Sequence, residues 1–184
     1  MDELVDILNP DGSYSGRHCL KSEAHRLGHL HPTVHAWLYC NARGILMQKR
    51  SENKNTFPNL WDVSVAGHVG SGEDITTAAL REVKEEVGLE LRVADLERIG
   101  THLERHIHSE DFIDNELHHI FLTAISPSFT PSELQLEEVT AVKFLSPKVL
   151  KSALENKKEA KRFVPHAKAY YDWVITVIED RIKS

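Results

Sequence analysis

Hydrophobic residues recur along the chain in patterns that predict a mixed α/β architecture. Short apolar runs rich in β-branched and aromatic residues predict strands over 4–8, 33–39, 45–48 and 61–65. The segments 9–12 and 41–44 combine Asn, Pro, Asp or Gly, which suit tight turns, so each predicts a hairpin. The polar segment 51–59, which contains Pro58, is predicted to be a loop.

Helical periodicity is clearest over 74–87. Apolar or small residues recur there at three- and four-residue spacing, at Ile75, Ala78, Ala79, Val83 and Val87. Gly88 follows and suits a helix C-terminus. The segment is therefore predicted to be an amphipathic helix with one buried face.

The remaining pattern predicts more sheet and then two helices. Strands are predicted over 89–93, 97–103, 116–125 and 139–145, and helices over 147–154 and 160–182. The aromatic stripe from Phe163 to Trp173 has helical spacing and is expected to pack against the sheet. Trp37 and Trp61 lie in strand-like runs and are expected in the core.

Size and composition narrow the class of protein. The 184 residues, 41% of them hydrophobic, suit a single domain over 1–184. Lys and Arg number 22 and Asp and Glu 28, so the formal net charge is 22 − 28 = −6, with no dense basic run. General nucleic-acid binding is disfavoured, because it requires a cationic surface.

The cysteines and the N-terminus predict a cytoplasmic protein that does not associate with membranes. Cys19 and Cys40 lack CxxC spacing, so neither a disulfide framework nor a cysteine zinc site is indicated. Residues 1–6 do not have a signal-peptide pattern, and no window offers 18 continuous apolar residues.

Candidate chemistry lies on the predicted helix 74–87. Glu82, Glu85 and Glu86 are spaced i, i+3 and i+4, which places three carboxylates on one face. Hard oxygen ligands on a rigid scaffold suit Mg²⁺, with Mn²⁺ as the alternative. A solvated acidic helix face is the competing interpretation.

The residues around these glutamates complete a specific motif. Gly67 is followed after five residues by Glu73, and after seven more by the run Arg81-Glu82-Val83-Lys84-Glu85-Glu86-Val87-Gly88-Leu89. This pattern matches the Nudix box at every specified position, and the chain resembles the Nudix hydrolases. Gly67 allows close approach of the backbone to a metal or phosphate, and Arg81 is predicted to hold Glu73 by a bidentate ion pair.

The Nudix resemblance implies a fold, an activity and a ligand set. The fold is an α/β/α sandwich with a mixed β-sheet, here with an N-terminal hairpin and C-terminal helices. The activity is Mg²⁺-dependent hydrolysis of a diphosphate linkage in a small molecule, a nucleoside diphosphate derivative or a related organic diphosphate. Glu82, Glu85 and Glu86 would be metal ligands, and the general base is left open between Glu85 and a residue outside the box.

A second resemblance connects the chain to the isopentenyl-diphosphate isomerase branch of the superfamily. It rests on Gln48-Lys49-Arg50, on the run from Phe57 to His68, and on Asp114-Asn115-Glu116. It implies a metal site at His25, His31, His68, Asp114 and Glu116. A surface or capping role for the histidines is the competing interpretation.

Ala66 is where the sequence departs from the isomerases, which require a reactive cysteine at that position. Without the thiol the acid/base pair for alkene protonation is incomplete, so hydrolysis is favoured over isomerisation. The intact box favours hydrolysis over a non-catalytic nucleotide- or metabolite-binding module, which would not need its three glutamates together with Arg81 and Glu73. Glu116 is then a candidate extra carboxylate, as metal ligand or base. The substrate and the oligomeric state are left open, a homodimer included.

Overall fold

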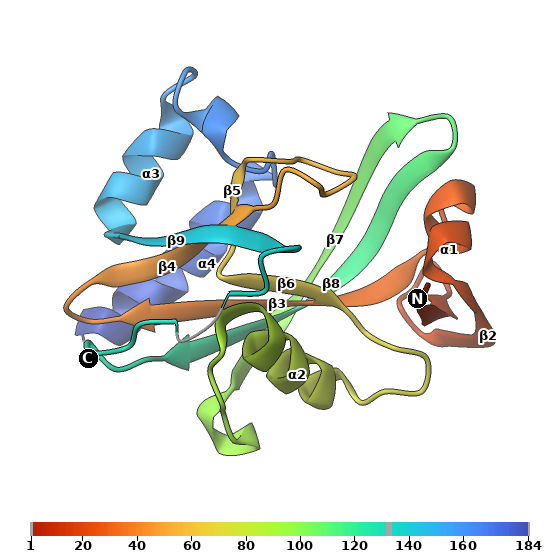
Figure 1. Cartoon of the computed structure of the whole chain (residues 1–184), viewed down its shortest axis with the longest axis horizontal. Coiled ribbons are helices and arrows are strands. Elements are labelled where there is room, and N and C mark those ends of the chain that lie inside the picture. The colour runs from red at the N-terminus through yellow and green to blue at the C-terminus, as the bar shows by residue number, and fades with distance from the viewer. Residues whose placement is uncertain (1, 132–133, 184) are drawn as a thin grey trace.

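The computed structural model describes residues 2–131 and 134–183, so the ends of the predicted domain lie outside it. The chain begins with an antiparallel hairpin of β1 (Leu4–Leu8) and β2 (Tyr14–Leu20), as predicted (Figure 1). A short helix, α1 (Lys21–Leu27), follows and ends at Gly28, whose φ is 64°. The sequence did not predict α1, because seven residues are too few to establish a helical period.

The second sheet is mixed and has the strand order β5-β4-β3-β8-β7. Its central pair, β3 (His31–Cys40) and β8 (Phe112–Ala124), is parallel, and β8 pairs antiparallel with β7 (Glu97–Ser109). The other edge of β3 pairs with β6 (Val65–His68) and with β4 (Gly44–Arg50). β4 in turn pairs with β5 (Trp61–Asp62) and β9 (Val139–Leu145).

Helices cover both faces of this sheet (Figure 1). Alternate residues of β3 point to opposite faces. Val34, Ala36 and Leu38 belong to the core cluster with α2 (Ile75–Val87), whereas Trp37 and Tyr39 belong to the cluster with α3 (Pro147–Glu155) and α4 (Lys168–Lys183). The predicted α/β/α sandwich is confirmed, and β3 is buried along its whole length because both of its faces are covered.

The aromatic residues of the last helix pack as the sequence predicts. Tyr170 and Tyr171 of α4 are buried in the same cluster as Trp37, which is fully buried. Trp61 is only partly buried and packs at the edge of that cluster. No helix in the described part of the chain is long and apolar enough to cross a membrane.

Several predicted elements or boundaries were wrong. β7 runs to Ser109 and β8 begins at Phe112, beyond the predicted 97–103 and 116–125. Residues 89–93 form no strand; Leu89 and Leu91 pack against the α2 cluster, and a 3₁₀ turn (Val93–Asp95) follows. The last helix begins at Lys168 rather than 160, after Pro165, which disfavours a helical conformation at the residue before it. The predicted strand 61–65 divides into β5 and β6. Between them the Ser64 side chain takes the place of a backbone partner, because its hydroxyl oxygen accepts a hydrogen bond from Leu38 N at 2.8 Å.

Candidate active site and its histidine clusters

The glutamate motif lies on α2, whose two ends are capped. The Asp74 side chain accepts hydrogen bonds from the backbone N–H groups of Thr76 and Thr77, and Gly88 ends the helix at φ 68°. Val83 and Val87 are buried against the sheet. This packing holds the adjacent glutamate face beside β6.

Arg81 fastens the preceding loop to this helix. Its Nε and Nη2 donate to the two carboxylate oxygens of Glu73, each at 2.9 Å, which is the predicted bidentate pair. Its Nη1 also donates to Glu82 at 2.8 Å and Glu85 at 3.1 Å, and its Nη2 to the backbone oxygen of His68 at 3.0 Å. Loop, helix and β6 are therefore held in one arrangement.

Gly67 allows the Glu82 carboxylate to lie directly against the backbone of β6. A Cβ at position 67 would stand 2.0 Å from Cδ of Glu82. Glu86 is only 3% exposed and accepts from Gln48 Nε2 at 3.1 Å and from Ala66 N at 3.3 Å. The sequence predicted that the backbone at Gly67 closely approaches a metal or phosphate. In the structure it closely approaches Glu82, which the motif assigns as a metal ligand.

Burial shapes the electrostatics of these carboxylates. Desolvation raises the pKa of Glu86 well above its usual value, and the neighbouring Glu82 adds to this effect. Burial also raises the pKa of Glu82, although Arg81 opposes the change. Glu85 is half exposed. A bound divalent cation would favour the charged forms of the two buried groups.

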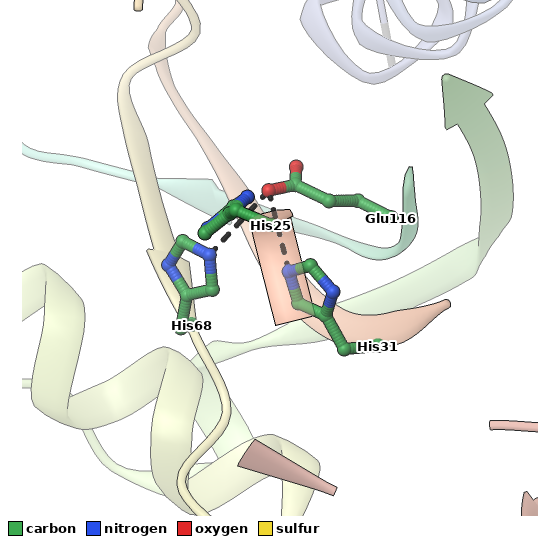
Figure 2. A group of neighbouring side chains, drawn as sticks. All are labelled: His25, His31, His68 and Glu116. Carbon is green, nitrogen blue, oxygen red and sulfur yellow. Dashed lines mark ion pairs between the residues drawn. The ribbon is translucent and has the colours of Figure 1, made fainter. Parts of the chain in front are cut away.

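A second group of side chains, here called the histidine cage, comprises His25, His31, His68 and Glu116, which converge from α1, β3, β6 and β8 (Figure 2). Glu116 Oε1 lies 3.4 Å from His68 Nε2 and 3.6 Å from His31 Nε2. The Nε2 atoms of His31 and His68 are buried and have no hydrogen-bond partner among the described residues. Such unpartnered ring nitrogens are suited to metal ligation.

Strand register assembles the histidine cage. His31 is opposite Glu116 in the parallel β3–β8 pair, and Thr33 is opposite His68 in the β3–β6 pair. Asp114 lies two residues before Glu116 and contacts His25 Nδ1 at 3.0 Å and His108 Nε2 at 2.8 Å. The structure thus brings together the residues that the isomerase resemblance indicated, with Asp114 behind His25.

A cavity of about 360 Å³ connects these features. Its wall includes three residues of the histidine cage, His25, His68 and Glu116. A smaller hollow lies over the glutamate helix, and Lys21, Lys54 and Gly67 line both the hollow and the cavity. Neither cysteine contributes to the cavity wall within the described residues. The cavity beside the histidine cage and the hollow over the glutamate helix therefore adjoin and share part of their walls.

The cavity wall also holds charged residues that the sequence analysis missed. His166 Nε2 lies 2.9 Å from Asp62 Oδ1, and its Nδ1 contacts Glu104 Oε2. Burial disfavours the charged imidazole, but these two carboxylates outweigh burial and raise the pKa of His166 to about 9. The alternation His102, Glu104, His106 was the available signal, because alternate strand residues share a face, but the strand was predicted only to residue 103.

The comparison with protein families agrees with the motif and the fold. The family model described as the NUDIX domain matches residues 29–167, which include the glutamate helix and most of the sheet. The chain belongs to the Nudix family.

Curated relatives place the chain more closely. An uncharacterised Nudix hydrolase of Clostridium acetobutylicum is 31% identical over 205 residues, covering 97% of this chain and 98% of that protein. Nudix hydrolase 3 of Arabidopsis thaliana is 34% identical over 172 residues, but the match covers 90% of this chain and only 22% of the relative's length. An isopentenyl-diphosphate Delta-isomerase of Paenarthrobacter aurescens is 29% identical over 160 residues, covering 86% of this chain and 84% of that protein. The predicted class, a Nudix-type hydrolase of the isomerase-like branch, is confirmed.

Solved structures support the fold. The crystal structure of DR0079 from Deinococcus radiodurans superposes with a TM-score of 0.63 at 24% sequence identity, and the match covers 83% of this chain and 88% of that one. At this identity the similarity establishes a shared Nudix architecture.

Proposed function

We propose that the protein hydrolyses a diphosphate linkage in a nucleoside diphosphate derivative or a related organic diphosphate, with Mg²⁺ or Mn²⁺ held by Glu82, Glu85 and Glu86. The buried Glu86 and the largely buried Glu82 beside Gly67, at the edge of the cavity, carry the proposal. Two carboxylates so far withdrawn from solvent and so close together are costly unless a cation neutralises them.

The bound metal would neutralise the diphosphate and polarise the attacking water. Gln48 Nε2 and Ala66 N hold the Glu86 carboxylate, while Arg81 holds Glu82 and Glu85. Lys21 and Lys54 line both hollows and supply positive charge where diphosphate oxygens would lie. These residues bind and orient the substrate's charged group.

The histidine cage fits a second divalent ion. Its unpartnered ring nitrogens and the Glu116 carboxylate form a mixed nitrogen and oxygen donor set facing the same cavity. His25, His31, His68 and Glu116 would hold the ion, and Asp114 would orient His25. Glu116 is also the candidate general base outside the box, with Glu85 as the other candidate.

The cavity wall disfavours the isomerase alternative. Ala66 lies where the isomerases require cysteine, and Cys19 and Cys40 are absent from the described cavity wall. The cavity wall also presents Asp62, Glu104 and His166, which suit a polar substrate better than a hydrocarbon chain. A non-catalytic module would have no need of the complete Glu82, Glu85 and Glu86 set.

The test is a Mg²⁺-dependent hydrolysis screen over nucleoside diphosphate derivatives, dinucleoside polyphosphates, cofactors and prenyl diphosphates. Glu85→Gln is expected to reduce turnover about 100-fold or more, whereas Glu90→Gln, an exposed control just beyond the helix, is expected to leave it unchanged. The proposal fails if no substrate is hydrolysed, or if Glu85→Gln is as active as the parent. Unchanged activity in Glu116→Gln would exclude Glu116 as base.

A further inference from the structure

A second group of metal-binding side chains converges beside the cavity and is here called the Glu104 cluster. Glu104, His106, His118 and His166 line the cavity, and His102 lies next to Glu104. These residues come from β7, from β8 and from the segment before α4. None of them belongs to the Nudix box or to the histidine cage. The cluster therefore requires an explanation of its own.

Four imidazoles surround one carboxylate. His166 Nδ1 contacts Glu104 Oε2, and the Nε2 atoms of His106 and His118 each lie 3.5 Å from the same oxygen. His102 Nε2 lies 3.8 Å from Glu104 Oε1. The Nε2 atoms of His102 and His106 are buried and make no hydrogen bond with any described residue.

An ion pair alone does not account for this arrangement. His166 already contacts both Glu104 and Asp62 and so balances the charge of Glu104. Charge balance therefore does not explain why His102 and His106 direct unpartnered ring nitrogens at the same carboxylate. Buried ring nitrogens without partners are costly, and natural proteins tolerate few of them. A ligand bound by all of these atoms would remove the free-energy cost of leaving them without partners.

Two of the separations in the cluster are those of ligands around one ion. Two N or O atoms bound to a tetrahedral Zn²⁺ at about 2.0–2.2 Å are about 3.3–3.6 Å apart. The separations of Glu104 Oε2 from the Nε2 atoms of His106 and His118 have this value, which is too long for a good hydrogen bond. One atom from each of Glu104, His106 and His166 also lies within 4.8 Å of the others.

Outer contacts orient these side chains as they do in metal sites. His166 has its second ring nitrogen 2.9 Å from Asp62, which Arg50 contacts at 3.0 Å. Glu104 accepts the Ala167 N–H through Oε1 at 2.9 Å, which leaves Oε2 directed toward the imidazoles. A carboxylate on the far nitrogen of a ligating histidine is a common second contact in such sites.

We propose that Glu104, His106 and His166 bind a transition-metal ion of the Zn²⁺ class, with His102 and His118 beside it. The ion would take the place of the proton between His166 and Glu104. Imidazole-rich sites select such ions over Mg²⁺, which prefers oxygen ligands. The cavity would then hold a transition-metal site at the Glu104 cluster, and the adjoining hollow a Mg²⁺-type site at the glutamate helix.

The test is a metal titration of chelator-treated, full-length protein with Zn²⁺ and Co²⁺, in excess Mg²⁺ and without substrate. Calorimetry and elemental analysis give the stoichiometry, and the visible spectrum of bound Co²⁺ reports its ligand environment. The parent protein is expected to bind about two equivalents, one at the histidine cage and one at the Glu104 cluster.

Glu104→Gln and His106→Ala are each expected to lose one equivalent and its Co²⁺ spectrum, while His68→Gln keeps that equivalent. His18→Ala, at an exposed position on β2, controls for histidine removal. Circular dichroism checks folding, and the partly exposed His106 provides a variant that leaves the Asp62–His166 contact in place. Because no turnover is measured, the result is independent of the proposed hydrolase activity.

Two outcomes would overturn the proposal. One is unchanged stoichiometry and spectrum in both Glu104→Gln and His106→Ala. The other is loss of all bound transition metal on substitution of His68 alone, which would assign the metal to the histidine cage.

Discussion

At the scale of single residues, the contact between Gly67 and Glu82 determines where the metal-binding carboxylate lies. Gly67→Ala is expected to displace the Glu82 carboxylate, because the added Cβ would stand 2.0 Å from Cδ. Turnover should fall about 100-fold or more, with little change in the circular dichroism spectrum. Gly70→Ala, whose Cβ would meet Glu73 at an ordinary 3.4 Å, is the matched control. Equal activity in the two variants would contradict this account of Gly67.

His119 makes a separate prediction about pH. Burial lowers the pKa of His119 from 6.5 to about 4, and Arg98, 2.6 Å from Nδ1, adds to the effect. The folded state therefore favours neutral His119, so this contribution to stability is complete above pH 6.5 and is lost as the pH falls toward 4.

The comparison variant for that prediction is His119→Asn, which keeps an acceptor for Arg98 but does not titrate. Between pH 6.5 and 4 the parent should lose on the order of 1 to 2 kcal/mol more unfolding free energy than the variant, after allowance for solvent screening near the surface. Urea denaturation at a series of pH values measures the difference. Parallel curves for the two proteins would show that His119 is not the titrating group.

At the scale of elements, Arg81 joins the loop before α2 to the helix and to β6. Arg81→Lys keeps the charge but loses the bidentate pair with Glu73 and the bond to the His68 backbone. We expect a 10- to 100-fold loss in apparent Mg²⁺ affinity or activity, and faster amide hydrogen exchange at Gly70. Arg92→Lys, which changes an exposed pair with Asp95, should behave as the parent. If both variants lose activity equally, the loop-to-helix contact is not the cause.

The β3–β4 turn is a second element with a backbone requirement. Gly44 has a φ of 91°, and a Cβ there would stand 2.3 Å from the backbone oxygen of Leu145 in β9. Gly16 has a similar φ of 78° and open space around it, so Gly16→Ala measures backbone strain alone. Gly16→Ala should cost about 1–2 kcal/mol of unfolding free energy, and Gly44→Ala should cost distinctly more. Equal costs, measured by urea denaturation, would mean that β9 moves aside freely.

At the scale of the whole molecule, metal binding is expected to couple to stability. Binding to the folded state alone should raise the unfolding free energy by about 2.7 kcal/mol when Mg²⁺ is at 100 times its dissociation constant. The gain should be smaller in Glu85→Gln than in Glu90→Gln. Thermal unfolding of chelator-treated protein with and without Mg²⁺ measures this increase in unfolding free energy. An equal increase in both variants would mean that the ion binds elsewhere.

Much of the architecture follows from local sequence patterns. The apolar run of β-branched and aromatic residues in β3 and the period of α2 predicted both elements, and the motif from Gly67 to Leu89 indicated the family because its signal is contiguous. The errors occurred where local signals are weak. Leu89 and Leu91 are apolar because they pack against α2, not because they belong to a strand.

The sequence by itself determined the glutamate helix, because its ligands lie within one helical turn, where spacing alone places them on one face. Only the tertiary structure decided the other two groupings. His31 and Glu116 are 85 positions apart and meet through the parallel β3–β8 register, while Glu104 and His166 meet because the segment before α4 folds over β7. Such contacts depend on long-range pairing, which is set by burial of the whole sheet between two helical layers and leaves no periodic signal in the chain.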